Sequence, residues 1–115
     1  MGTLNNKTRL LTICLAGELA EKEIPLFRGA VLGSMGAEAD VLYHNHIGED
    51  GFRYRYPLIQ YKRIYGHPTI VCIGEGVDAI QPFLDSEVRT LRLGNRLMTT
   101  KIQERRYSDF EITAT

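Results

Sequence analysis

The sequence predicts an α+β domain with an antiparallel sheet, and three observations lead to this prediction. Residues 10–16 and 70–73 are apolar runs of strand length and composition. A helix-like segment follows the first run, and a Tyr-Gly-His-Pro turn at 65–68 is short enough to close a hairpin. The chain has 115 residues, of which 43% are hydrophobic and 24% charged, which suits one globular domain with a modest core.

The first two elements are expected to be a strand and a helix. Residues 9–18 contain a nearly continuous apolar run, typical of a central strand that is buried on both faces. Pro25 suits the first turn of a helix that begins at residue 26 or 27 and ends at 36. Its buried stripe would consist of Phe27, Ala30, Val31 and Met35.

Three glycines disfavour this helix. Gly29, Gly33 and Gly36 each cost about 1 kcal/mol relative to alanine at an exposed interior position. Because glycines four residues apart lie on one side of a helix, they allow another backbone to approach closely. Tight packing of the helix on the sheet and contact with a ligand are both consistent with this spacing.

The rest of the chain is expected to complete the sheet. After a surface loop at 37–51, a long strand at 54–65 leads through the turn into an antiparallel return strand at 69–73. A short helix covers 77–84, where Pro82 implies a kink or an early end. A strand at 90–93 follows, and 97–107 would be a further strand or hairpin partner. This order is that of a ferredoxin-like βαββαβ fold, here one domain spanning residues 1–115.

The ends of the chain and its cysteines suggest a cytoplasmic protein. The apolar runs are too short to span a membrane, and residues 1–8 are polar, so neither a transmembrane helix nor a secretory signal is recognised. Cys14 and Cys72 lie in apolar runs without the spacing of a zinc cage or a disulfide framework. They are interpreted as buried, reduced core residues, and neither a metal nor a cofactor is predicted.

The charges are balanced overall but unevenly distributed. The formal net charge is zero, with four basic and seven acidic residues in 1–51 against ten basic and seven acidic residues in 52–115. Between residues 89 and 106, six basic side chains stand against Glu104 alone. A local basic surface and ordinary solvated strand faces are both compatible with this run.

The segment from Tyr43 to Tyr56 carries the candidate chemistry. His44 and His46 titrate near neutral pH, so one can act as general base and the other as general acid in RNA strand cleavage, each worth roughly a hundredfold to ten-thousandfold. They can equally form a metal-ligand pair with Glu49 and Asp50, or be solvated surface histidines. His67, in the turn, is expected to be structural.

An aromatic and arginine ladder follows the two histidines. In an extended strand Arg53 and Arg55 project to one face while Phe52, Tyr54 and Tyr56 project to the other. Any half-buried strand shows such alternation, so it predicts an RNA surface only if exposed rings are available for stacking. Tyr61 and Tyr65 are the candidates for such rings.

Three strings in order carry a resemblance to a known family: PLFRGA at 25–30, YHNH at 43–46 and FRYRYPLIQYK at 52–62. They resemble the N-terminal domain of the CRISPR-associated endoribonucleases that process precursor CRISPR RNA, members of the RAMP superfamily, and look closest to the B-subtype branch. The similarity spans about residues 9–93. It implies that this chain is the first of two ferredoxin-like domains and that its partner is CRISPR repeat RNA, which such enzymes cut without metal to leave a cyclic phosphate.

The resemblance also implies site residues. Several members use histidine from the loop after the first helix, and His44 and His46 are the matching positions. Contacts with RNA are expected from five basic residues: Arg28, Arg53, Arg55, Lys62 and Arg63. Some relatives add a helix tyrosine and a strand lysine, but here residues 26–36 contain no tyrosine and 23–61 no lysine. Arg53 would replace that lysine only as an electrostatic clamp.

The chain is also shorter than such enzymes. It ends at Thr115, and nothing in it matches the glycine-rich loop that the second domain contributes to RNA binding. The alternative is therefore a non-catalytic ferredoxin-like module that binds RNA or protein, with a homodimer in place of the second domain. A small metal-binding or regulatory domain is the third interpretation.

Overall fold

The computed structural model describes residues 7–35 and 58–111, with the backbone alone at residues 7, 110 and 111. The described elements in chain order are β1 (Lys7–Leu15), η1 (Glu21–Glu23), α1 (Ile24–Ser34), β2 (Ile59–Ile64), β3 (His67–Ile73), α3 (Glu75–Ala79), α4 (Gln81–Leu84), β4 (Val88–Leu93) and β5 (Arg96–Glu111).

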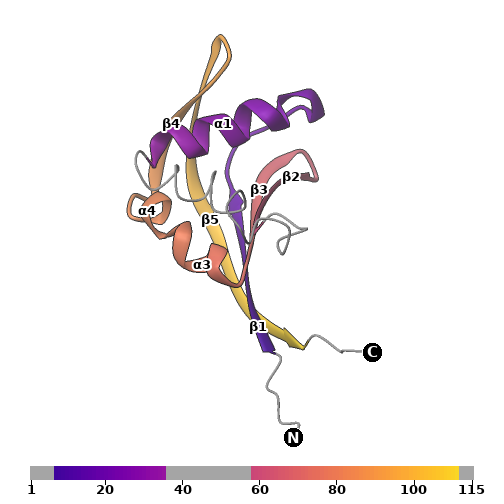
Figure 1. Cartoon of the computed structure of the whole chain (residues 1–115). Coiled ribbons are helices and arrows are strands. Elements are labelled where there is room, and N and C mark those ends of the chain that lie inside the picture. Colours follow the sequence, from indigo (N-terminus) through magenta and orange to yellow (C-terminus); the bar gives the residue numbers. More distant parts are fainter. Residues whose placement is uncertain (1–6, 36–57, 112–115) are drawn as a thin grey trace, which may run out of the picture.

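The strands form one antiparallel sheet in the order β2-β3-β1-β5-β4. In the long strand β5, one end pairs with β1 and the other with β4. Figure 1 shows the β4–β5 hairpin extending past α1 as an arm. The α+β, ferredoxin-like fold predicted from the sequence is confirmed, with β5 beside β1 as the last strand of the βαββαβ unit and β4 added at the edge.

The helices cover one face of the sheet and form the core with it. Leu11, Ile13 and Leu15 of β1 point to this face, and their cross-strand partners on β3 include Cys72 and Ile70. Phe27 and Val31 of α1, together with the apolar residues of α3 and α4, belong to the same buried cluster. Because β1 alternates, only one of its faces is fully buried, whereas the sequence predicted burial on both.

Two prolines within the described elements show how backbone geometry sets element boundaries. β3 begins at His67, so Pro68 lies inside the strand; it is tolerated because the β1–β3 ladder starts only at Thr69. The predicted second helix is divided into α3 and α4, which meet at Ile80 just before Pro82. The expected kink or early end at this proline is therefore confirmed.

The close approach expected at the helix glycines occurs elsewhere. No described atom lies within 4 Å of a Cβ built on Gly29 or Gly33, and Gly36 lies outside the described residues. Instead, a Cβ built on Gly76 of α3 would lie 2.4 Å from the carbonyl oxygen of Leu58. Glycine is therefore required where α3 packs against the start of β2.

The two cysteines are free and point to opposite faces of the sheet. Cys72 is buried in the core, and burial raises the pKa of its thiol to about 12, whereas Cys14 is only half-buried. The predicted burial therefore holds fully for Cys72 alone. None of the helices in the described ranges has the length and apolar composition needed to cross a membrane.

Candidate functional site

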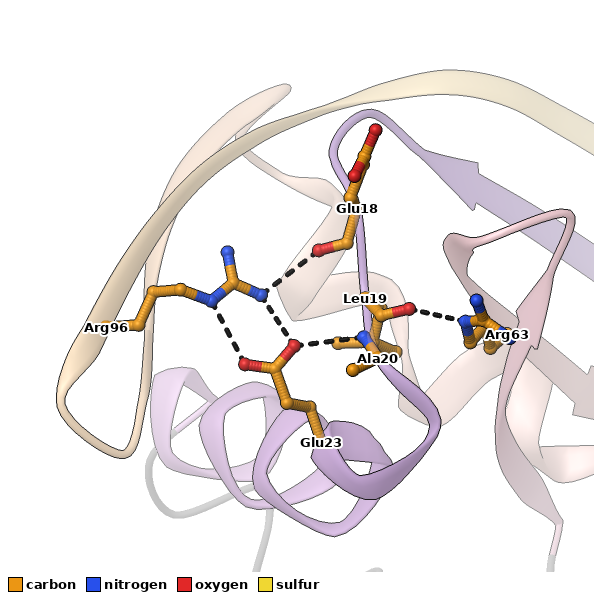
Figure 2. A network of polar contacts seen from close by, with 6 residues as sticks. All are labelled: Glu18, Leu19, Ala20, Glu23, Arg63 and Arg96. Carbon is orange, nitrogen blue, oxygen red and sulfur yellow. Dashed lines mark hydrogen bonds and ion pairs between the residues drawn. The ribbon is translucent and has the colours of Figure 1, made fainter.

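The best-defined polar site surrounds the connection between β1 and α1, residues 16–23. Arg96, at the base of the β4–β5 turn, donates to both carboxylate oxygens of Glu23, from Nε at 3.0 Å and from Nη2 at 2.8 Å. Nη2 also donates to the Glu18 carbonyl oxygen, and Glu23 accepts a further bond from the Ala20 backbone N–H at 3.0 Å (Figure 2). The bidentate pair fixes the arm over the start of α1.

This environment favours the ionised form of Glu23. Hydrogen bonds from Arg96 and from the Ala20 backbone lower the pKa of the Glu23 carboxyl to about 2. The same hydrogen bond raises the pKa of Arg96. Glu23 is thus charged at physiological pH, and its role is to hold the arm in place rather than to exchange protons.

The β2–β3 hairpin holds the same connection from the other side. The Leu19 backbone N–H donates to the Gly66 carbonyl oxygen at 2.8 Å, and Arg63 Nε donates to the Leu19 carbonyl oxygen (Figure 2). His67 Nδ1 lies 2.6 Å from the Gly17 carbonyl oxygen; since a carbonyl only accepts, this nitrogen carries the proton. These contacts agree with the structural role expected for His67.

The predicted RNA-binding residues within the described ranges do not form one cluster. Lys62 and Arg63 are consecutive in β2, so they project to opposite faces of the sheet. Arg63 shares the helix-covered face with Tyr61, whose pKa is raised by burial, while the nearby charge of Arg28 has a smaller, opposite effect. Arg28 and Arg63 are therefore on one side of the sheet and Lys62 on the other.

Tyr61 is not the exposed stacking ring that the sequence allowed. Its ring packs edge-on against Phe27 of α1, with 5.6 Å between ring centroids, and its hydroxyl is buried without a hydrogen-bond partner among the described residues. Tyr65, by contrast, is 95% exposed. Of the two candidate rings, only Tyr65 is available to a ligand.

The predicted catalytic residues His44 and His46, together with Arg53 and Arg55, lie outside the described residues. Their roles therefore stay predictions.

The start of β2 is held in place by Leu58. Its carbonyl oxygen accepts a hydrogen bond from the Ile73 backbone N–H at 2.8 Å and packs against Gly76 of α3.

Four of the six basic residues between 89 and 106 contact other groups of the domain. Arg89 donates to the carbonyl oxygens of Phe83 and Pro82, both at 2.9 Å, and its guanidinium lies 5.0 Å from the centroid of the Phe83 ring. Arg105 reaches the Leu84 carbonyl oxygen and Arg106 pairs with Glu104. Among the described residues, Arg96 and Arg106 are the members of this run that pair with carboxylates, whereas Arg89 and Arg105 bond to carbonyl oxygens and keep their charge. No sequence signal indicated the contacts that Arg89 and Arg96 make.

The fold and these contacts define a single ferredoxin-like α+β domain whose sheet carries helices on one face and a hairpin arm at its edge. The chain belongs to the Cas6b N-terminal domain family, whose model matches residues 6–111.

One solved structure, described as the crystal structure of Cas6b, shares this fold with a TM-score of 0.62 and 22% sequence identity. The match covers 93% of this chain and 48% of that chain, so the present chain spans about half the length of the protein it resembles. No curated protein matches the sequence.

Proposed function

We propose that this chain is the N-terminal, RNA-binding part of an endoribonuclease that processes CRISPR repeat RNA. The observation that carries the proposal is the family match over residues 6–111. The ferredoxin-like fold is consistent with it but hosts many functions, so the fold adds no argument about chemistry.

His44 and His46 are proposed to perform the cleavage step. One imidazole accepts the proton of a ribose 2′-hydroxyl, whose oxygen attacks the adjacent phosphorus, and the other donates a proton to the departing 5′-oxygen as the P–O5′ bond breaks. The products are a 2′,3′-cyclic phosphate and a 5′-hydroxyl, and the step needs no metal. Arg53 and Arg55 would stabilise the negative charge that develops on the phosphoryl oxygens.

Binding is proposed to use the described basic residues on both sides of β2. Lys62 is exposed, and Arg63 donates from Nε to Leu19, while no hydrogen bond from its two Nη groups is found within the described residues. Arg28, exposed on α1, would contact RNA on the same side as Arg63. These residues would position the backbone rather than read its sequence.

The test incubates this chain with labelled repeat RNA in EDTA and scores binding and cleavage separately. We expect His44→Ala/His46→Ala to abolish formation of the cyclic phosphate, and a 2′-deoxy substitution at the scissile nucleotide to do the same in wild-type protein. His67→Ala is the control for loss of an imidazole: it removes a bond to a backbone carbonyl oxygen, so RNA that it binds should still be cleaved to the cyclic phosphate. Metal-dependent cleavage, or cleavage of the 2′-deoxy RNA, would contradict the mechanism.

A second candidate function is recognition without cleavage. It is favoured by the observation that this chain covers 48% of the matching structure, because a site that draws residues from both halves would be incomplete in this chain. In the same assay, RNA binding with no product would support this recognition module and reject self-sufficient catalysis.

A further inference from the structure

The β2–β3 turn displays an aromatic residue in a backbone conformation that does not suit it. Tyr65 and Gly66 have φ values of 53° and 83°, as a two-residue type I′ hairpin requires at both positions. Asn-Gly is the preferred pair in such turns, and a bulky non-glycine residue at positive φ is uncommon. Tyr65 is therefore expected to make the turn less stable than asparagine would at the same position.

Packing does not explain the choice either. The Tyr65 side chain is 95% exposed, so its ring contributes little to the core. Tyr107, the other exposed tyrosine in the described ranges, is 58% exposed but lies in a regular strand at negative φ, where tyrosine is favoured. Tyr65 thus destabilises the turn without stabilising the core, which points to a contact with a molecule outside the chain.

The turn is rigidly held. The Gly66 carbonyl accepts from Leu19, Arg63 donates back to Leu19, and His67 donates to Gly17, so both strands of the hairpin are attached to the β1–α1 connection. A ring on such a support loses little conformational freedom when a ligand stacks on it. Lys62, Arg63 and His67 lie within three residues of Tyr65 in the sequence, with Lys62 and Arg63 on opposite faces of the sheet.

We infer that Tyr65 stacks on an unpaired base of bound RNA, while Lys62, three residues earlier in β2, contacts the phosphate backbone. This inference rests on the proposed function and adds a specific residue and binding mode to it. Aromatic rings on rigid supports beside cations are the usual means by which proteins hold single-stranded nucleic acid.

The test uses Tyr65→Asn, which removes the ring while giving the turn its preferred residue. We expect the thermal stability of this variant to equal or exceed that of the wild type, while its affinity for a labelled single-stranded RNA falls roughly 5- to 100-fold. Tyr65→Phe keeps the ring and should bind like the wild type, and Tyr107→Asn is the control for loss of an exposed tyrosine elsewhere.

Two further readouts separate stacking from charge. RNA with an abasic site at the contacted position should bind wild type and Tyr65→Asn equally, because no base is left to stack. The variant should keep the wild-type salt dependence, whereas Lys62→Gln should make it shallower. If Tyr65→Asn binds intact RNA as tightly as the wild type does, the stacking role is wrong and the proposed function stands. If the wild type binds no RNA, the proposed function fails and this inference with it.

Discussion

Replacing Gly76 by alanine should destabilise the domain mainly through contact with the carbonyl group of Leu58. The added Cβ would lie 2.4 Å from the Leu58 carbonyl oxygen and 3.0 Å from its carbonyl carbon, both backbone atoms. A carbon and a carbonyl oxygen normally stay more than about 3.2 Å apart, so Leu58 or α3 must move by close to 1 Å. Movement of Leu58 would also lengthen the 2.8 Å hydrogen bond from the Ile73 N–H to the same oxygen.

The magnitude follows from the cost of overpacking a buried site. Forced backbone shifts of this kind cost about 1–3 kcal/mol. Alanine is otherwise unstrained at this φ and is a better helix former than glycine, so the destabilisation comes from the clash alone. For a domain of this size, the loss corresponds to a decrease of about 4–12 °C in Tm. Urea unfolding followed by circular dichroism, together with a thermal scan, would measure both quantities.

Gly29→Ala and Gly33→Ala are the matched controls. Both glycines lie in α1, where no described atom lies within 4 Å of the position that the added methyl group would take, so alanine should raise the free energy of unfolding by about 0.5–1 kcal/mol. Glycine-to-alanine substitution is thus expected to lower the free energy of unfolding in α3 and to raise it in α1. Gly76→Ala with wild-type stability would refute the packing argument, and destabilisation by all three variants would show that the effect is not specific to Leu58.

Two other predictions concern the arginines that hold the hairpin arm and α4. The pKa of Glu23 is about 2 in the folded chain, against an ordinary value of 4.5, so its stabilising contribution should be lost as pH falls from about 4.5 to 2. Arg96→Met should reduce that part of the acid dependence in urea midpoints measured against pH, with the Ala20 N–H bond to Glu23 retaining a smaller share. A variant profile parallel to that of the wild type would contradict this prediction. Arg89→Met should cost about 1–3 kcal/mol in urea unfolding, because two carbonyl oxygens lose their donor. Arg92→Met, at an exposed position on the same strand, should change stability by less than about 0.5 kcal/mol, and equal effects would show that the carbonyl bonds are unimportant.

The elements that could be predicted from the sequence are those whose local pattern agrees with their packing. The stripe of Phe27, Val31 and Met35 specified α1 despite its glycines, because all three side chains are buried. The extent of β5 was harder to predict: it runs from Arg96 to Glu111, whereas the sequence indicated only 97–107, as a strand or hairpin partner. Residues 103–109 are all exposed, so the apolar alternation that marks a half-buried strand is missing there.

The candidate site was less predictable because its contacts join residues far apart in sequence. Arg96 and Glu23 are separated by 73 positions, and both residue types are common on surfaces, so nothing local indicated their pairing. The basic run was compatible with either a binding surface or solvated faces, but Arg89 and Arg105 instead satisfy carbonyl oxygens at and near α4. Tyr65 did leave a signal: a tyrosine stands before glycine in a tight hairpin turn, where asparagine is expected.

These arginine contacts bear on how this domain would bind RNA. The chain has no net charge, and four of the six basic side chains in 89–106 are engaged with carbonyl oxygens or carboxylates of the domain itself. Each phosphate that a protein neutralises adds about 0.7 to the slope of log affinity against log salt for a single strand, so contacts from the five proposed binding residues would give a slope of about 3.5. Uncharged contacts add binding free energy that does not vary with salt, and the exposed ring of Tyr65, on a turn that is hydrogen-bonded to the β1–α1 connection, is well suited to provide them.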